Sequence, residues 1–350
     1  MTEKKKVVVA MSGGVDSTLT ARLLQEAGYD VYGATMQQFD GQDNSDAVAM
    51  AAFLGIPHQI LDVRDTYEKI VLQYFIDSYA GGKTPNPCMI CDFHIKFGCF
   101  YEEMRKHFDA PYFATGHYAR IVYDSGRGKY EVRKGIDLTK DQSYMMYHLT
   151  QDQLAHIIFP LGRVCKKDTR RMAEDRGLPV AHKKESQDIC FLTSEKSYAD
   201  FLRERAPRIF KPGDITDQKG RLLGHHRGLP YYTIGQRKGL GISSPFPLYV
   251  TALDSEKNRV IVGRNEDLFR TKLLAGAPAF TDGEAPGRLF RAEAKIRYGM
   301  RVHPCTVAIQ KDGRALVTFD EPQRAVTPGQ SVVFYDGDRL IGGSDIIRAL

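Results

Sequence analysis

The segment Ser12–Ser17, with the sequence SGGVDS, constrains the fold more than any other part of the chain because of its neighbours. Residues 4–10 change from lysines to valines, and this apolar, β-branched run predicts a short buried strand. After the segment, apolar residues recur at helical spacing from Leu19 to Ala27, and Gly28 stands where a helix C-cap is expected. The two glycines therefore lie in a turn between a buried strand and a helix.

The same order of strand and helix recurs after this turn. We expect further strands at residues 31–36, 58–63 and 112–115, and helices at residues 46–54 and 67–79. Alternation of this kind is typical of a mostly parallel sheet with helices on its faces. The sequence therefore predicts an α/β fold for the first part of the chain.

A change in composition near Phe201 predicts that two smaller domains follow. Glycine and proline become frequent from there, which is typical of a small, loop-rich domain. After Gly276, short segments alternate apolar and polar residues, which predicts a small β-barrel. These segments are Arg291–Arg297, Thr306–Gln310, Ala315–Phe319 and Ser331–Tyr335. We expect domains at residues 1–200, 201–275 and 276–350.

The overall composition is that of an ordinary soluble protein. Of the 350 residues, 42% are hydrophobic and 26% are charged. No apolar run approaches the roughly 18 residues of a membrane span, and Val7–Ala10 is too short for a signal peptide. We therefore expect a cytoplasmic protein without a membrane partner, in which the six cysteines do not form a structural disulfide framework.

Positive charge is concentrated in the segment Phe201–Leu240. It holds nine basic and three acidic residues, and this excess equals the net charge of +6 of the whole chain. A local basic patch favours a polyanionic partner, although a solvated surface would have the same composition. The basic residues are Arg203, Arg205, Arg208, Lys211, Lys219, Arg221, Arg227, Arg237 and Lys238.

The chemistry of the glycine turn indicates phosphate binding. Glycines let backbone N–H groups approach a phosphate closely, and the following helix directs its positive end to the same place. Ser12 and Ser17 add hydroxyl donors, and Asp16 is a candidate ligand of a magnesium ion. The turn is not the P-loop of kinases, because no GKS or GKT follows. A tight structural turn is the alternative, and the strand–turn–helix context favours phosphate.

Two segments contain cysteines that are candidates for thiol chemistry. In TPNPCMIC, residues 84–91, two prolines predict a stiff loop that presents Cys88 and Cys91. No second CxxC pair completes a zinc site, so a redox pair, a nucleophile or a cluster ligand remain. Cys190 follows the polar run 183–188, which favours an accessible loop over a core position. We interpret the other three cysteines as structural: Cys99, Cys165 and Cys305.

Six motifs in this order resemble the bacterial tRNA-specific 2-thiouridylase family over essentially the whole chain. They are SGGVDS, TPNPCMIC, TGHYAR (115–120), KDQSYMMY (140–147), SQDICF (186–191) and YTIGQRKGLG (232–241). The resemblance implies a PP-loop ATP pyrophosphatase domain, a small central domain and a C-terminal β-barrel. It also implies the activity of the family, which is 2-thiolation of the wobble uridine of certain tRNAs.

The resemblance assigns roles residue by residue. Cys91 is implied as the nucleophile and Cys190 as the persulfide carrier. Near the target base it places Asn86, Pro87 and Cys88. The implied ATP-binding residues are Ala10, Met11, Ser12, Gly13, Gly14, Val15, Asp16, Ser17, Met36 and Gly116. The implied tRNA contacts are His117, Lys140, Asp141, Gln142, Arg297, Tyr298 and Gln330.

One position departs from the family pattern, which typically has Asp where this chain has Cys88. The chain therefore offers three thiols: Cys88, Cys91 and Cys190. This set resembles the three-cysteine site of other tRNA thiolases that hold an iron–sulfur cluster. A cluster bound by the three thiols is consequently an alternative to the persulfide route.

On the persulfide route, ATP adenylates the uridine C2 oxygen with the help of Mg²⁺, and persulfide sulfur from Cys190 then attacks C2. Exchange with Cys91 leaves a transient disulfide that a reductant must clear. The expected partners are tRNA and a protein that delivers sulfur as a persulfide. The rival functions are another PP-loop enzyme, such as a 2-thiocytidine synthase or an amide-forming ligase, and a non-catalytic nucleotide-sensing RNA-binding protein.

Overall fold

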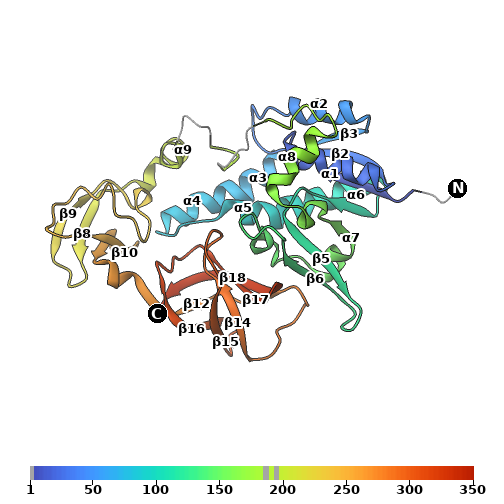
Figure 1. Cartoon of the computed structure of the whole chain (residues 1–350). Coiled ribbons are helices and arrows are strands. Elements are labelled where there is room, and N and C mark those ends of the chain that lie inside the picture. The colour runs from blue at the N-terminus through green and yellow to red at the C-terminus, as the bar shows by residue number, and fades with distance from the viewer. Residues whose placement is uncertain (1–3, 184–188, 193–196) are drawn as a thin grey trace.

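The computed structural model describes residues 4–183, 189–192 and 197–350. Within these ranges the strands form a parallel sheet, a smaller mixed sheet and an antiparallel barrel. Figure 1 shows the parallel sheet and the mixed sheet toward opposite ends of the molecule, with the barrel below helix α4 (Gln73–Ala80) in this view. The predicted α/β fold is confirmed. The polar run expected before Cys190 lies outside the described residues from position 184 to 188.

The parallel sheet has five strands in the order β3-β2-β1-β4-β7, and every neighbouring pair runs parallel. Val7, Val8 and Val9 of the central strand are fully buried, as expected for a strand that is covered on both faces. The strands are β1 (Lys6–Ala10), β2 (Asp30–Gln37), β3 (His58–Asp62), β4 (Tyr112–Ala114) and β7 (Ile157–Ile158).

Glycines mark the limits of the first two helices. Helix α1 begins directly after Gly14, and α2 ends at Gly55, which adopts a left-handed φ of 65°. No helix of the described residues is long and apolar enough to cross a membrane. The helices of this part include α1 (Val15–Glu26), α2 (Ser45–Leu54), α6 (Tyr101–Phe108), η3 (Ser143–Met146), α7 (Gln151–His156), η4 (Pro160–Arg163) and α8 (Lys166–Glu174).

Two helical runs contain π-helical segments. The helix predicted over residues 67–79 is observed as α3 (Arg64–Tyr67), η1 (Glu68–Leu72) and α4 in succession. The second run continues from α5 (Pro87–Ile90) through η2 (Cys91–Phe100) into α6. Such π segments are frequent at functional sites.

The CxxC cysteines lie in the second helical run, so the expectation that a stiff loop carries them was wrong. Pro87 occupies the first helical position, where its missing N–H is not needed and its fixed φ suits a helix. The side-chain oxygen of Asn86 accepts a hydrogen bond from the Met89 N–H at 3.3 Å and caps the helix. Cys88 is therefore in α5, and Cys91 begins η2.

The central part of the chain forms a four-stranded sheet in the order β10-β11-β8-β9. Its core contains Ile215, Val250, Val260 and Val262, which are all fully buried. The elements are α9 (Tyr198–Arg205), η5 (Pro207–Ile209), β8 (Gly213–Asp217), β9 (Leu222–His226), η6 (Leu229–Tyr231), β10 (Tyr249–Asp254), β11 (Arg259–Gly263) and η7 (Asn265–Leu268).

The C-terminal strands form the predicted barrel. Six antiparallel strands follow the order β12-β16-β15-β14-β17-β18, and pairing of β12 with β18 closes the circle. Strand β12 precedes the domain limit expected after residue 275, and both expected limits stay predictions. The strands are β12 (Phe269–Ala275), β13 (Ala279–Phe280), β14 (Leu289–Lys295), β15 (His303–Ile309), β16 (Ala315–Arg324), β17 (Ser331–Asp336) and β18 (Arg339–Ala349).

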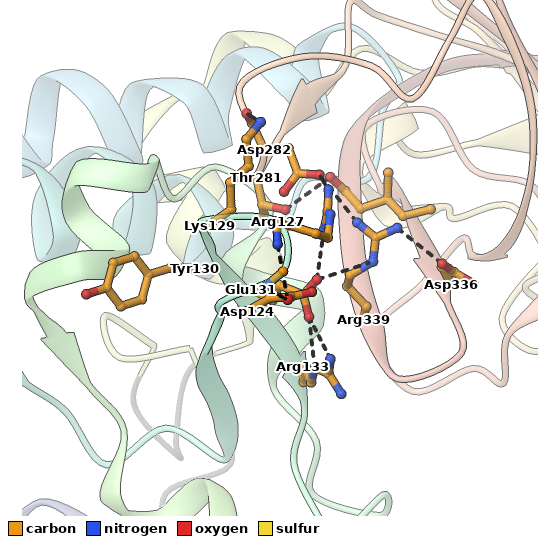
Figure 2. Close-up of polar contacts among 12 residues, drawn as sticks. Asp124, Arg127, Lys129, Tyr130, Glu131, Arg133, Thr281, Asp282, Asp336 and Arg339 are labelled. Atoms are coloured by element: carbon orange, nitrogen blue, oxygen red, sulfur yellow. Dashed lines mark hydrogen bonds and ion pairs between the residues drawn. The ribbon is translucent and has the colours of Figure 1, made fainter.

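An ion-pair network joins the barrel to a hairpin of the first domain, β5 (Ala119–Asp124) and β6 (Lys129–Lys134), as Figure 2 shows. Glu131 is buried, and its carboxylate accepts hydrogen bonds from Arg127 and from the guanidinium of Arg133, each at 2.7 Å. Arg339 of β18 completes the contact, 3.9 Å from the carboxylate of Glu131. Because a buried charge must be paired, this network favours one arrangement of hairpin and barrel.

Candidate active site

The glycine turn has the geometry of a phosphate cradle. Gly13 has a φ of +70°, and a Cβ atom there would lie 2.5 Å from the Cβ of Asp46, so only glycine fits. The Ser12 N–H donates a hydrogen bond to Ser17 Oγ at 3.2 Å, and this hydroxyl donates to the Gly14 carbonyl at the same distance. The turn is thereby held at the N-terminus of α1, where backbone N–H groups attract anions.

Asp16 of this turn is bound by two groups from later parts of the chain. Lys166 Nζ lies 2.7 Å from both carboxylate oxygens, and Tyr118 OH donates to one of them at 2.8 Å. Gly116 also approaches closely, because a Cβ atom there would lie 3.0 Å from Asp16 Cβ. Any larger residue at position 116 would therefore crowd the backbone and side chain of Asp16.

The other predicted ATP residues lie at the carboxyl ends of neighbouring parallel strands. Ala10 is the last residue of β1, and the carbonyl of Met11 accepts a hydrogen bond from Thr35 Oγ1 at 2.8 Å. Met36 stands near the end of β2, which pairs directly with β1. Ligands of open α/β sheets bind at this edge, so the described structure brings the predicted ATP residues together.

Cys91 and Cys190 each contact a polar side chain that the sequence analysis did not single out. Gln38 Nε2 donates a hydrogen bond to Cys91 Sγ at 3.4 Å. Tyr67 OH lies 3.1 Å from Cys190 Sγ, at hydrogen-bond distance. Cys91 and Tyr67 are buried, whereas the residue Cys190 is exposed. All six cysteines of the chain are free thiols in this structure.

The thiols are held in their neutral form. Burial raises the pKa of Cys91 far above its ordinary range, and Lys96 only partly opposes this. Although Cys88 is exposed as a residue, desolvation of its thiol, assisted by Asp92, raises its pKa to about 11. Desolvation likewise raises the pKa of Cys190, while its hydrogen bond with Tyr67 acts in the opposite direction. A nucleophilic thiolate therefore has to be generated when substrate arrives.

A buried charged cluster follows Cys91 in the same helical run. Asp92 pairs with Lys96 one turn away, and its other oxygen lies 3.6 Å from His117 Nε2. Burial would raise the pKa of Asp92, but Lys96 and His117 outweigh it and hold the pKa at about 2. Burial lowers the pKa of His117, which also contacts Thr115 Oγ1 through Nδ1 at 2.6 Å. The predicted tRNA contact His117 is thus placed inside the protein.

The barrel reaches the loop that precedes the CxxC helix. Gln330 Nε2 donates to the carbonyl of Thr84 at 2.9 Å, and the Thr84 N–H donates to the carbonyl of Pro328 at 3.0 Å. Gln330 therefore contacts Thr84 and Pro85, just before the CxxC helix, although it is far away in the sequence. Its contact with tRNA stays a prediction.

The remaining predicted tRNA residues are distributed around the junction of the hairpin and the barrel. Asp141 is buried and accepts hydrogen bonds from the Gly135 N–H and from Ser143, and Gln142 Oε1 accepts from the Tyr118 N–H. Lys140 is partly buried beside them. Arg297 is half-buried and donates to Thr327 Oγ1 at 2.8 Å, and Tyr298 is exposed.

Several site residues were missed by sequence reasoning: Gln38, Tyr67, Asp92, Lys96, Tyr118 and Lys166. The spacing of Asp92 and Lys96 after Cys91 was a usable signal, because residues four apart on a helix can pair. Tyr118 belongs to the quoted TGHYAR motif. No local pattern distinguishes Gln38, Tyr67 or Lys166.

Among the residues that the structure describes, no group of three His, Cys, Asp or Glu side chains could hold a metal ion. Cys88, Cys91 and Cys190 do not form such a group in this structure. Mg²⁺ is often bound by one carboxylate together with substrate phosphates, and Asp16 offers such a carboxylate, although Lys166 Nζ lies 2.7 Å from both of its oxygens.

The fold and the glycine turn define an α/β protein with a site shaped to bind phosphate, and Cys91 and Cys190 each contact a polar side chain. Family models match three consecutive parts of the chain: the tRNA methyl transferase HUP domain at residues 5–194, the tRNA methyl transferase PRC-barrel domain at residues 199–264, and the aminomethyltransferase beta-barrel domain at residues 270–346.

Full-length relatives make the assignment more specific. The chain is 45% identical to tRNA-specific 2-thiouridylase MnmA 1 of Thermoanaerobacter sp. (strain X514), covering 99% of both chains. It is 48% identical to tRNA-specific 2-thiouridylase MnmA of Moorella thermoacetica, covering 97% of this chain and 98% of the relative. The chain belongs to the tRNA-specific 2-thiouridylase family.

A solved structure is also similar to part of the chain. The U34-tRNA thiolase NcsA from Methanococcus maripaludis, with its [4Fe-4S] cluster, is 17% identical at a TM-score of 0.36. The alignment covers 59% of this chain and 67% of that one. A similarity this low carries no argument about the chemistry of the site.

Proposed function

We propose that this protein transfers sulfur to C2 of the wobble uridine of tRNA at the expense of ATP, in the cytoplasm. The observation that carries the proposal is the short segment from Gly116 to His117, which links the two halves of the site. Gly116 packs against Asp16 of the phosphate cradle, and His117 pairs with Asp92, the residue after Cys91. Activation by ATP and thiol chemistry can therefore act on one bound base.

The first step activates the base. The uridine C2 oxygen attacks the α-phosphorus of ATP, pyrophosphate leaves, and the oxygen becomes part of an adenylate. The backbone N–H groups of Gly13 and Gly14, together with the N-terminus of α1, stabilise the phosphate charge. Mg²⁺ held by Asp16 would supply further charge neutralisation. AMP then becomes the leaving group in place of an oxygen that leaves poorly.

The second step transfers sulfur. A partner protein that carries a persulfide loads Cys190, whose terminal sulfur then attacks C2 while AMP departs. Cys91 attacks Sγ of Cys190, and the bond between the two persulfide sulfurs breaks toward the uridine. The products are 2-thiouridine and a Cys91–Cys190 disulfide, which an external dithiol reduces. The transferred sulfur gains the two electrons that the two thiols lose.

Pyrophosphate release in the presence and absence of tRNA tests the proposal, together with mass detection of 2-thiouridine in digested tRNA. We expect release that depends on tRNA, and a thionucleoside only when a persulfide donor is supplied. An amide-forming ligase would release pyrophosphate without thiolating tRNA. A non-catalytic RNA-binding protein would bind tRNA and release none.

A further inference from the structure

The side chain of Lys166 places a positive charge directly at the phosphate cradle, and no role has been assigned to it so far. It is the first residue of α8, and its Nζ lies 2.7 Å from Oδ1 and from Oδ2 of Asp16. The lysine side chain is 11% exposed and the aspartate side chain is 31% exposed, so the pair is partly buried with the carboxylate open to solvent. The ammonium also lies 5.2 Å from the centre of the Tyr118 ring.

The first turn of α8 is fastened to the cradle by more than this ion pair. Tyr118 OH bridges Asp16 Oδ1 and Thr169 Oγ1, each at 2.8 Å, and Thr169 is fully buried. The backbone N–H of Lys166 donates to Asp137 Oδ2 at 3.0 Å. The backbone of Lys166 is therefore held in place whether or not its ammonium binds Asp16.

A carboxylate at this position conflicts with a polyphosphate ligand. Asp16 is the second residue of α1, at the same positive helix end where the phosphates of ATP would bind. Two anionic groups at one helix end repel each other unless a cation lies between them. Lys166 supplies a compact charge with three hydrogen-bond donors, enough to contact a carboxylate and a phosphate together.

We propose that Lys166 is an ATP-binding residue: its ammonium neutralises Asp16 in the free protein and donates to a phosphate oxygen when ATP binds. This inference rests on the proposed use of ATP and adds a residue that the family resemblance did not assign. It makes the ion pair between Asp16 and Lys166 a preformed part of the site rather than a fold-stabilising contact alone.

The test compares binding of a non-hydrolysable ATP analogue with binding of adenosine, which lacks phosphates. Lys166→Met should weaken analogue binding roughly tenfold or more while leaving adenosine binding unchanged. Lys166→Arg keeps the charge and should recover part of the loss. The neighbouring exposed residue provides the control, and Lys167→Met should bind both ligands as the wild type does.

A second background separates phosphate binding from support of Asp16. In an Asp16→Asn protein, the further change Lys166→Gln leaves a neutral, hydrogen-bonding pair that preserves packing. If Lys166 binds phosphate, this change still weakens binding of the ATP analogue and leaves binding of adenosine unchanged. Equal analogue affinity with and without the Lys166 change overturns the inference, as does an equal loss for both ligands. If the wild-type protein binds no analogue, both the proposed use of ATP and the proposed role of Lys166 are wrong.

Discussion

The two halves of the active site are built in opposite ways. The glycine turn of the phosphate half is local, since strand, turn and helix follow one another and the bonds within the turn join Ser12, Gly14 and Ser17, although Asp16 at its border meets Lys166 across 150 positions. The thiol half is assembled from separate segments: Tyr67 meets Cys190 across 123 positions of the chain. A local turn can be recognised from a motif, whereas contacts between distant segments depend on how those segments pack in the folded domain.

The halves also differ in how they carry charge. The phosphate half presents an ionised pair, Asp16 and Lys166, at its border. In the thiol half the nearby cation Lys96 is already paired with Asp92, and burial keeps Cys91 protonated. The difference is that charge borders the phosphate half, whereas desolvation in the thiol half raises the pKa of its cysteines.

The largest expected effect comes from Asp16→Ala, which breaks the phosphate half alone. Pyrophosphate release should fall roughly a hundredfold or more, because the change removes a proposed metal ligand and the partner of Lys166. The fold should remain, which circular dichroism can check. Alkylation of Cys190 should proceed as in the wild type, and full pyrophosphate release by the folded variant would refute the assignment of Asp16.

Tyr67→Phe should damage the thiol half alone. Loss of its hydrogen bond should raise the pKa of Cys190 further, because this bond is the largest of the effects that oppose desolvation of the thiol. We expect alkylation and sulfur transfer at neutral pH to slow roughly tenfold, while pyrophosphate release stays unchanged. The pH profile of alkylation measures the shift, and an unshifted profile would show that Tyr67 only packs.

Cys88→Asp should have a smaller effect and separates the two sulfur routes. On the persulfide route, Cys88 does not carry sulfur, and the variant should keep activity within about threefold, in the usual range for a residue that assists without reacting. The measurement is thiolation together with iron content after purification without oxygen. If the wild type contains iron and the variant loses both iron and thiolation, the persulfide route is wrong.

The smallest effect on chemistry should come from reversing the charges of Arg237 and Lys238, both exposed in the central domain. The variant should bind tRNA more weakly and with a shallower salt dependence, because fewer counterions are released. Its rate at saturating tRNA should not change. Arg314→Glu on the barrel is the control, since Arg314 is already paired with Asp312. If the charge-reversal variant and the Arg314→Glu control have equal salt slopes, the basic patch is only a solvated surface and does not bind tRNA.

Much of the phosphate half follows from the sequence by itself. Burial of β1 and the start of α1 after Gly14 come from local periodicity and glycine chemistry, and the alternation of strands and helices indicated a mostly parallel sheet. The motif order also indicated the family. The prediction of a stiff loop at the CxxC pair was wrong, because Pro87 begins a helix. Asn86 stabilises the start of this helix by capping it.

Only the tertiary structure decided which polar side chains meet the reactive groups. Lys166 reaches Asp16 across 150 positions, and Gln38 reaches Cys91 across 53. It also buried His117 against Asp92 and brought Gln330 to Thr84. Such contacts leave no periodic trace in the chain, because their partners are set by sheet order and domain packing rather than by neighbouring residues.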